Sequence, residues 1–411
     1  MNAAPRRIGR IWLVAAALLL ATPATAADVD FQKFLETLWP AAREQGVSRA
    51  TFDAAIQGLE PDLSLPDLVI PGRVDRQPAQ AEFVQTPAEY LKETYFDKLA
   101  AQGRTLAEQH RGLLAKVELR FGVPAPVILA IWARETDYGA AKLPYDAIRA
   151  LATQAWLGRR KEQFREEFVL ALKMLQDGHV RRENMRSSWG GALGQPQLIP
   201  SSFYKYAVDF DGDGRKDIWT SMPDVLGTIA NHLVELGWQR GQRWAYEVRA
   251  PQGADCAVAQ PEVKLKIGEW VRRGYAVASD RKPSGDELEI EASLLMPAGT
   301  YGPAFLTPAN YFVLKDYNFS DLYVLFVGHL ADRIAGARAF ETPWQKIEQL
   351  KTSSLEQMQR ELTRRGLYKD KIDGKAGMLT RAALGDYQKQ NGLSLDCWPT
   401  QAVLDHMARS R

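Results

Sequence analysis

The pattern of apolar and polar positions changes along the chain. From residue 28 to about residue 245, apolar residues recur at three- and four-residue spacing, as in segments 30–45, 106–122 and 161–178. This period is typical of amphipathic helices. From about 245 to 300, apolar and polar residues alternate in segments 245–251, 270–279 and 287–297, with the turn sequence KPSGDE at 282–287. We therefore predict a mainly α (α+β) protein, a helical body that carries a small antiparallel sheet.

The chain after the sheet is predicted to form one more helix of the body and then a second domain. Segment 320–340 is an apolar helix pattern, segment 341–354 is typical of a linker, and the second domain is expected to start near Ser354. Two segments in that domain, 372–384 and 395–404, share the order Asp, turn, Thr and apolar helix. Two copies do not make a solenoid. We expect Thr380 and Thr400 to cap the helices that follow them.

The first 26 residues have the pattern of a secretory signal peptide. Arg6, Arg7 and Arg10 precede an apolar run at 11–20, and small residues lead to a cleavage position after Ala26. An uncleaved membrane anchor is the alternative, but the run is too short to span a bilayer comfortably. We expect an exported mature chain without a transmembrane segment.

Composition excludes one class of partner and sets the size of the fold. The 411 residues are 46% hydrophobic and 25% charged, which suits two or more globular domains. Lys plus Arg number 52 and Asp plus Glu number 50, so there is no excess positive charge for binding nucleic acid. We therefore expect no nucleic-acid partner.

The mature chain has two cysteines, Cys256 and Cys397. Export permits a disulfide between them. However, they lie in different predicted domains, and the sequence does not show that their Cα atoms come close enough for a bond. We favour two packed, unpaired thiols, with an interdomain disulfide as the alternative.

Segment 126–139 is predicted to form a core helix that ends in a carboxylate. It begins near Pro126 and stops by Gly139, and residues 127–133 are apolar on every face. Glu135 lies in the last turn, where partial burial and the negative end of the helix dipole both raise the pKa of a carboxyl group. A carboxyl that stays protonated near neutral pH can act as a general acid on a glycosidic bond. The alternative is an ordinary helix-end salt bridge with Arg134 or another arginine.

Segment 186–219 combines glycines with carboxamides, serines and aromatic residues. Glycines allow the backbone to approach a ligand closely, and carboxamides and aromatic rings suit sugars. A mobile surface loop is the alternative, but residues 192–203 are too apolar for one. We expect Ser201 or Ser202 to cap a helix that starts at Phe203.

Four ordered motifs resemble the B-type lytic murein transglycosylases over residues 30–340. They are IWARETDYG at 131–139, the segment 191–219, TIANHLVELGW at 228–238 and DYNFSDLY at 316–323. The resemblance implies a lysozyme-like catalytic domain over residues 27–345 that cleaves the bond between N-acetylmuramic acid (MurNAc) and N-acetylglucosamine (GlcNAc) in periplasmic peptidoglycan. It further implies that Glu135 is the only catalytic carboxylate, first as the acid and then as the base for the C6 hydroxyl that closes a 1,6-anhydro ring. Asp137 is then structural.

The resemblance also implies roles for other residues of these motifs. Tyr311 aligns with an aromatic residue that packs near the saccharide. His232 stands where the family often has an aromatic residue, and we expect it to be a packed imidazole rather than a catalytic one. The residues implied to bind the sugar or to surround the glutamate are Ser188, Gln197, Tyr317, Asn318 and Tyr323.

The sequence DFDGDGRKD raises the question of a calcium site. Its alternating carboxylates, Asp209, Asp211, Asp213 and Asp217, resemble the start of an EF-hand loop. Position twelve is Thr220 rather than the required Glu. We favour an exposed Asp-Gly turn, with structural calcium as the alternative, and we expect no cofactor to be required.

Residues 353–411 resemble the small three-helix peptidoglycan-binding domain of many wall hydrolases. The resemblance implies a second, weaker wall site that raises the local substrate concentration. Cys397 stands where glycine is common, so the turn there is expected to differ. The residues that carry the resemblance are Asp373, Gly374, Gly377, Thr380, Ala383, Tyr387, Gln388 and Gly392.

Two other functions fit parts of the pattern. One is a hydrolase on the same framework, which would leave reducing ends, although an inverting enzyme would need a second carboxylate. The other is a non-catalytic scaffold that holds other enzymes on glycan, which the Glu135 helix and the Ser188 and Gln197 loop argue against. The expected partners are peptidoglycan glycan strands and periplasmic wall enzymes.

Overall fold

The computed structural model describes residues 26–73, 81–278 and 282–410. The predicted signal peptide lies outside these residues except for Ala26. Within the described ranges, no helix is both long and apolar enough to cross a bilayer.

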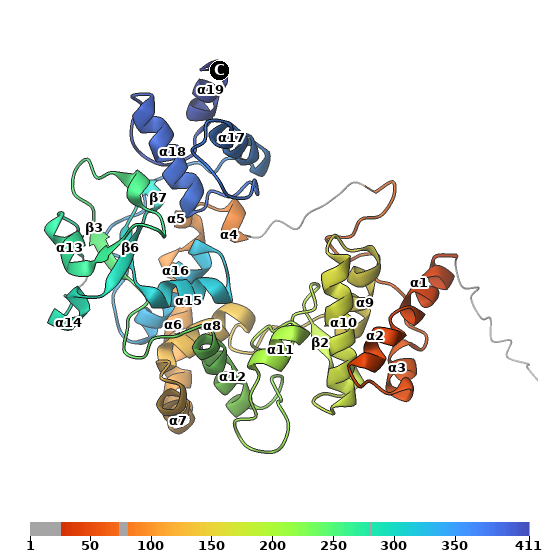
Figure 1. Ribbon diagram of the computed structural model, residues 1–411. Coiled ribbons are helices and arrows are strands. Elements are labelled where there is room, and N and C mark those ends of the chain that lie inside the picture. Colours follow the sequence, from red (N-terminus) through yellow and green to blue (C-terminus); the bar gives the residue numbers. More distant parts are fainter. Residues whose placement is uncertain (1–25, 74–80, 279–281, 411) are drawn as a thin grey trace, which may run out of the picture.

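The helices of the main body form two groups, each around its own core (Figure 1). The predicted helix over 30–45 is divided, because Pro40 begins a new helix after a turn. The first group contains α1 (Ala26–Glu36), α2 (Trp39–Glu44), α3 (Arg49–Ile56), α9 (Ala147–Leu157) and α10 (Lys161–Gln176).

The second group packs around the apolar helix that ends in the candidate acid. The predicted helix over 106–122 is broken at His110, whose backbone (φ −107°, ψ 19°) ends one helix and begins the next. This group contains α4 (Ala81–Val84), α5 (Pro87–Tyr90), α6 (Glu93–Gln109), α7 (Arg111–Phe121), α8 (Ala125–Thr136), α12 (Met222–Glu235), α15 (Ala309–Tyr317) and α16 (Asp321–Ile334).

Helix α11 (Pro200–Tyr206) lies between the two groups and contacts α10 and α12 (Figure 1). The expectation that Ser201 or Ser202 caps it is wrong, because the helix starts earlier and its cap position is Ile199. Ser201 instead binds Glu167 of α10 through both its amide (2.8 Å) and its hydroxyl (2.6 Å). A two-stranded ribbon of β1 (Tyr145–Asp146) and β2 (Arg186–Ser187) lies beside α9.

The predicted sheet is present, with five antiparallel strands in the order β4-β6-β8-β3-β5. One prediction within it is wrong in part: residues 270–272 of the expected strand 270–279 belong to a short helix over 267–272, because Trp270 turns inward and its indole N–H donates to the carbonyl of Ala292. The turn sequence at 282–287 opens a short helix with a capping box between Ser284 and Glu287. The elements are β3 (Tyr246–Arg249), η2 (Cys256–Val258), β4 (Lys264–Lys266), α13 (Ile267–Arg272), β5 (Ala276–Val277), α14 (Gly285–Leu288), β6 (Glu291–Leu295), β7 (Pro297–Thr300) and β8 (Ala304–Thr307).

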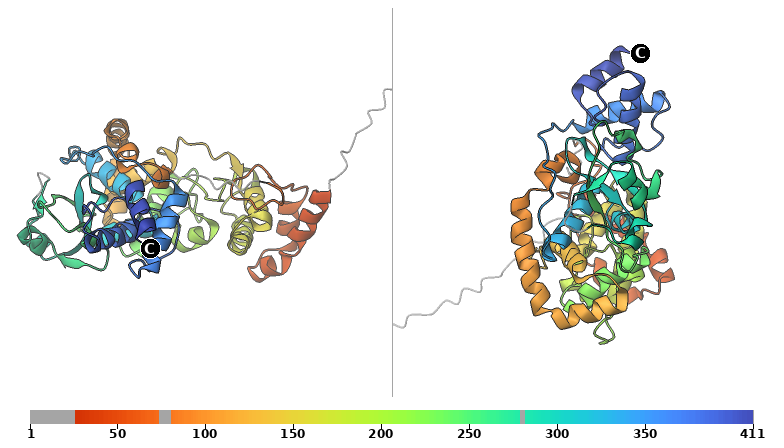
Figure 2. Two further views of the ribbon diagram at one scale, coloured as in Figure 1. Left: turned by 90° about the horizontal axis from the view of Figure 1, so that it is seen from above. Right: turned by 90° about the vertical axis from the view of Figure 1, so that its left-hand side faces the viewer.

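The C-terminal domain consists of α17 (Thr352–Arg364), α18 (Met378–Gln390) and α19 (Gln401–Arg409) around a core of its own. It lies against the sheet side of the main body, at the opposite end from α1–α3 (Figure 2). Thr400 caps α19 as expected, accepting from the amide of Val403. Thr380 does not cap α18, because that helix begins at Met378. The hydroxyl of Thr380 instead donates to the carbonyl of Lys375 (3.1 Å).

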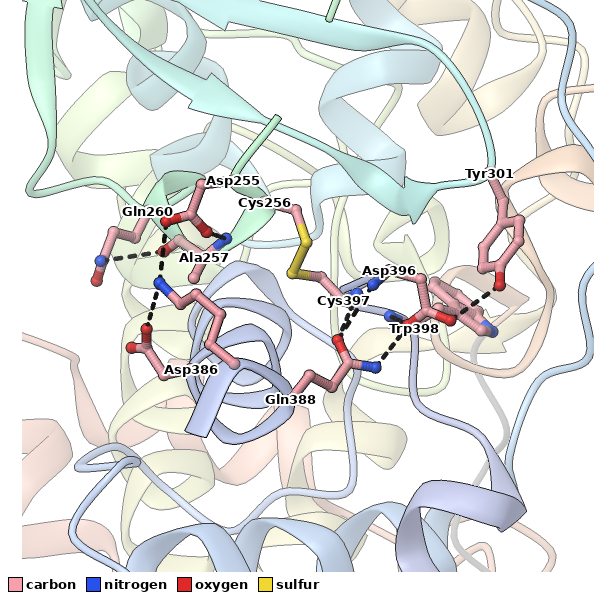
Figure 3. Close-up of a disulfide and its surroundings, with 11 residues drawn as sticks. Asp255, Cys256, Ala257, Gln260, Tyr301, Asp386, Gln388, Asp396, Cys397 and Trp398 are labelled. Atoms are coloured by element: carbon pink, nitrogen blue, oxygen red, sulfur yellow. Dashed lines mark hydrogen bonds and ion pairs between the residues drawn. A yellow bond between two sulfur atoms is a disulfide. The ribbon is translucent and has the colours of Figure 1, made fainter. Parts of the chain in front are cut away.

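A disulfide joins Cys256 to Cys397, with the two Cα atoms 6.1 Å apart, so the preference for unpaired thiols is wrong (Figure 3). The bond connects η2 beside the sheet to the turn after α18. Cys397 has a positive φ of 54°, a conformation that glycine adopts more readily. Gln388 holds this turn by accepting from the amide of Cys397 (2.9 Å). Packing between the domains, which the sequence does not reveal, brings the two cysteines together.

Candidate active site

Glu135 lies at the end of α8, where the chain leaves the second helix group toward the first (Figure 1). All residues from Val127 to Ala133 are buried, as expected for a core helix. The helix then stops sharply, because Asp137, Tyr138 and Gly139 all have positive φ values (49°, 56° and 80°). This stop leaves the Glu135 side chain partly exposed at the rim of the core.

The carboxyl group of Glu135 is held by one tyrosine. The hydroxyl of Tyr323 on α16 donates to Oε1 at 2.5 Å. Burial raises the pKa of Glu135 to about 7, against the opposing effects of this hydrogen bond and of the Arg134 charge. Burial, together with the neighbouring Glu135, also raises the pKa of Tyr323 well above its usual range, so its hydroxyl stays protonated and remains a donor. The site therefore contains a carboxyl group that keeps its proton to higher pH than an ordinary glutamate.

Arg134 does not bind the carboxylate next to it in the sequence. Its guanidinium donates to the hydroxyl of Tyr90 (2.6 Å), lies 3.9 Å from the carboxylate of Glu82, and stacks over the rings of Tyr90 and Phe326. The salt-bridge alternative for Glu135 is therefore not realised.

A row of rings runs beside Glu135. His232 stacks on Tyr206 with the ring centroids 3.8 Å apart and contacts Tyr317 at 4.4 Å, and Tyr317 lies nearly parallel to Tyr323 at 6.4 Å. Burial and the charge of Lys205 lower the pKa of His232 to about 4, so the imidazole is neutral near pH 7. His232 is thus a packed ring that supports Tyr317.

The glycine-rich loop, which connects β2 to α11, is fixed to the end of α8. The side chain of Gln195 accepts from the indole N–H of Trp132 (2.7 Å) and donates to the carbonyl of Trp219 (2.7 Å). The main-chain carbonyl of Gln195 accepts from the hydroxyl of Thr136 (3.0 Å). Gly194 must be glycine, because a Cβ there would lie 2.6 Å from Ile218. Sequence reasoning counted Gln195 only among the carboxamides that suit sugars and did not reveal that it fixes the loop to α8.

Ser188 and Gln197 both lie on this loop and shape it. The hydroxyl of Ser188 accepts from the amide of Ala192 (3.1 Å), and Gln197 has a positive φ of 56° with its side chain donating to the carbonyl of Gly194 (2.8 Å). The loop reaches the ring row through the hydroxyl of Tyr317, which donates to the carbonyl of Pro196 (3.0 Å). The structure thereby connects Gln197 and Tyr317 to the surroundings of Glu135.

Two of the predicted site residues lie beneath the site. Asn318 accepts from the amide of Ser320 (3.2 Å) and so shapes the turn between α15 and α16. Tyr311 is 0% exposed, and its hydroxyl donates to Asp321 (2.8 Å). The ring of Tyr311 is thus buried in the protein here, and its expected place near the saccharide stays a prediction. Asp321 received no role from the sequence, although it lies in the DYNFSDLY motif.

The Asp-Gly loop is largely satisfied by its own backbone. Single oxygens of Asp209, Asp211 and Asp213 lie within 4.8 Å of one another, close enough to share a cation. However, Asp209 accepts from three backbone amides of the loop at 2.6 to 3.2 Å, and Asp217 accepts from the amides of Trp219 and Thr220. Calcium needs six to eight oxygens, and these carboxylates are already bound to amides.

Comparisons with known proteins agree with this geometry. Residues 30–332 match the Transglycosylase SLT domain model, and residues 351–407 match a peptidoglycan binding domain model. The chain is 31% identical over 232 residues to membrane-bound lytic murein transglycosylase B of Escherichia coli (strain K12), a match that covers 56% of this chain and 62% of that protein, less than two thirds of its length.

Solved structures of Pseudomonas aeruginosa SltB3 resemble the fold over 92% of this chain and 99% of theirs, at 36% identity. The complex with NAG-anhNAM-pentapeptide superposes with a TM-score of 0.80, and the complex with NAG-NAM-pentapeptide with a TM-score of 0.82.

Proposed function

Because the chain belongs to the Transglycosylase SLT domain family, we propose that it is a lytic transglycosylase of peptidoglycan. It cleaves the β-1,4 bond between MurNAc and GlcNAc without water and leaves 1,6-anhydro-MurNAc ends. The resembling SltB3 binds an anhydro-muramoyl fragment in one crystal structure and the corresponding non-anhydro fragment in another. The observation that carries the proposal is the single carboxyl group of Glu135, with a pKa of about 7 at the junction of the two helix groups.

The proposed reaction uses Glu135 twice. Its carboxyl first protonates the glycosidic oxygen as the bond from that oxygen to muramoyl C1 breaks. The hydroxyl of Tyr323, 2.5 Å from Oε1, stabilises the carboxylate that forms. The carboxylate then takes the proton of the muramoyl C6 hydroxyl, whose oxygen forms the new bond to C1. Each proton and bond is accounted for, and because the substrate supplies its own nucleophile, no second carboxylate is needed.

The remaining side chains would hold the substrate. We assign Ser188 and Gln197 on the glycine-rich loop to hydrogen bonds with the sugars beside the cleaved bond. Tyr317, with His232 packed behind it, keeps the loop at a fixed distance from Glu135 through its bond to Pro196. The reaction requires sub-ångström placement of the acid against the glycosidic oxygen, and this framework supplies it.

The proposal extends to location and wall contact. The sequence of the first 26 residues supports export, and a peptidoglycan substrate supports a periplasmic location for the mature protein. The match of residues 351–407 to a peptidoglycan binding domain supports a second contact with glycan strands. Such a contact raises the local substrate concentration without any new chemistry. Other periplasmic wall enzymes are the expected protein partners.

We propose that the reaction needs no metal ion. The proton transfers are assigned to Glu135 alone, and the Asp-Gly loop is held by bonds from its own amides to Asp209 and Asp217. If calcium binds, Asp209, Asp211 and Asp213 are the residues that would contact it.

Digestion of purified sacculi with product mass spectrometry tests the function. Wild type is expected to release 1,6-anhydro products, and Glu135→Gln to release none. Asp137→Asn is a matched control, because Asp137 is exposed and its left-handed backbone suits Asn. Reducing ends in place of anhydro ends would identify a hydrolase. Wild-type digestion by Glu135→Gln would refute Glu135 as the acid, and a wild-type protein that binds sacculi without products would be a scaffold.

A further inference from the structure

The C-terminal domain contacts the main body through a buried ion pair. Arg381 on α18 lies 3.0 Å from the carboxylate of Asp321 at the first turn of α16, and these side chains are only 7% and 8% exposed. The other oxygen of Asp321 accepts from Lys315 (2.5 Å) and from Tyr311 (2.8 Å). Arg381 also donates to the carbonyl of Ala376 (2.5 Å). We call Tyr311, Lys315, Asp321 and Arg381 the interdomain cluster.

The charges of this cluster are well matched. Burial by itself would raise the pKa of Asp321, but the charges of Lys315 and Arg381 outweigh it and hold the pKa well below its usual range. Asp321 is therefore ionised at every pH at which the protein would work. A buried carboxylate of this kind is held in place by its partners, because moving it away from them leaves a charge without compensation.

The interdomain cluster lies two positions along α16 from the residue that binds Glu135. Asp321 and Tyr323 are both in the first turn of α16, and the N-cap residue Ser320 accepts from the amide of Tyr323 (3.4 Å). The hydroxyl of Tyr323 in turn donates to Glu135. A shift of this first turn therefore moves the hydroxyl relative to the carboxyl group.

We propose that Arg381 of the C-terminal domain is a positioning residue for the transglycosylase reaction, which fixes the first turn of α16 through Asp321 and so holds the hydroxyl of Tyr323 on Glu135. This inference rests on the proposed function of Glu135. It gives the C-terminal domain a role in the chemical step, in addition to any contact with the wall.

Arg381 is not needed to attach the C-terminal domain. The Cys256–Cys397 disulfide joins the two domains covalently (Figure 3). Lys389 forms a second interdomain ion pair with Asp255 (2.9 Å). Lys389 contacts Asp255, the residue before η2, and not Asp321 of α16. Removing Arg381 also leaves Asp321 with two partners, Lys315 and Tyr311. The loss of Arg381 should therefore remove one of the three contacts that fix Asp321 and loosen the first turn of α16, while the domain stays in place.

The pH dependence of activity reports this change. The groups that interact with the charge of Glu135 are Tyr323 on α16, Tyr317 on α15, Tyr90 on α5, Glu82 on α4 and its own neighbour Arg134. The hydrogen bond from Tyr323 lowers the pKa of Glu135. If Tyr323 moves away, that pKa rises, and the pH above which the acid is lost moves upward. A residue that only stabilises the fold would not produce this shift.

A double-mutant cycle tests the proposal with a soluble glycan fragment as substrate. The variants are Arg381→Gln, Tyr323→Phe and both together in the full chain, with Lys389→Ala as the matched interdomain control. Arg381→Gln should lower kcat about tenfold, as expected for a displaced catalytic contact, with KM unchanged and the alkaline limb of the kcat/KM profile at higher pH. In the Tyr323→Phe background, the same substitution should have little further effect. Lys389→Ala should match wild type.

The outcomes separate this inference from the proposed function. If Arg381→Gln has the kcat and pH profile of wild type, or if its effect adds fully to that of Tyr323→Phe, the positioning role is refuted while Glu135 keeps its role. If Glu135→Gln is as active as wild type, the proposed function itself fails. Should Arg381→Gln not fold, judged by its thermal melt, Arg381→Lys goes through the same cycle. Non-additivity with Tyr323→Phe supports the proposal and additivity overturns it.

Discussion

Replacing Tyr323 with Phe should move the pH range of the enzyme. The substitution removes only the hydroxyl that donates to Glu135 at 2.5 Å. A hydrogen bond to a charged group contributes about 1.5 to 3 kcal/mol, and one unit of pKa corresponds to about 1.4 kcal/mol. The pKa of Glu135, about 7 in the wild type, should therefore rise by about 1 to 2. Since the acid must be protonated to act, activity should persist to higher pH.

The assay is the pH dependence of kcat/KM for release of anhydro products from a soluble glycan. The alkaline midpoint should lie near pH 7 in the wild type and about 1 to 2 pH units higher in Tyr323→Phe. Tyr204→Phe is a matched control, because its hydroxyl binds Asp177 on the surface of the first helix group and lies away from Glu135. A midpoint in Tyr323→Phe that stays in place or moves down would show that the hydroxyl does not stabilise the carboxylate.

Three further predictions concern stability. The pKa of Glu135 is about 7 in the folded protein, above its ordinary value of 4.5. Between these two pH values the folded protein keeps a proton that the unfolded chain releases, so the free energy of unfolding falls as the pH rises. Between pH 5 and pH 8, the free energy of unfolding of the wild type, measured by urea melts, should fall by about 1 to 3 kcal/mol more than that of Glu135→Gln. An equal pH dependence in both proteins would contradict this prediction. Reduction of Cys256–Cys397 should lower the free energy of unfolding by about 2 to 4 kcal/mol, and equal melts with and without reductant would refute that. The wild type should have the same melting temperature in calcium and in a chelator, and Asp209→Ala should lower the melting temperature under both conditions. A rise in the wild-type melting temperature with calcium would refute the idea that backbone amides alone hold the loop.

The core helix and its carboxylate follow from local sequence. An all-round apolar stretch from Val127 to Ala133 can only be stable inside a core, so its last turn must reach the core's edge. The raised pKa of Glu135 then follows from burial. The sequence also indicates the glycine-rich loop, because glycines, carboxamides and rings are concentrated there. The transglycosylase family follows from the order of four motifs, which carries more information than any one of them.

The errors arise where distant parts of the chain decide the local structure. Segment 270–279 has the alternating pattern of a strand. Trp270, however, is buried against β6 and its indole N–H donates to the carbonyl of Ala292, so the first part of the segment is helical. Thr380 is of a residue type that often caps helices, but α18 begins two residues before it. Arg381 and Asp321 are 60 positions apart, and periodicity does not reveal which pairs at such a distance meet. The same holds for the two cysteines.

The disulfide also decides what a cut in the connecting segment would do. Cys256 and Cys397 are 141 positions apart, and the bond between them closes a ring of backbone that includes most of the sheet, α15, α16 and the link at 335–351. A protease that nicks that link would open the ring but would not release α17–α19, which would remain tethered beside the sheet. The bond can form only when Cys256 and Cys397 share an oxidising environment, so the ring closes only after the whole segment between them has entered that environment.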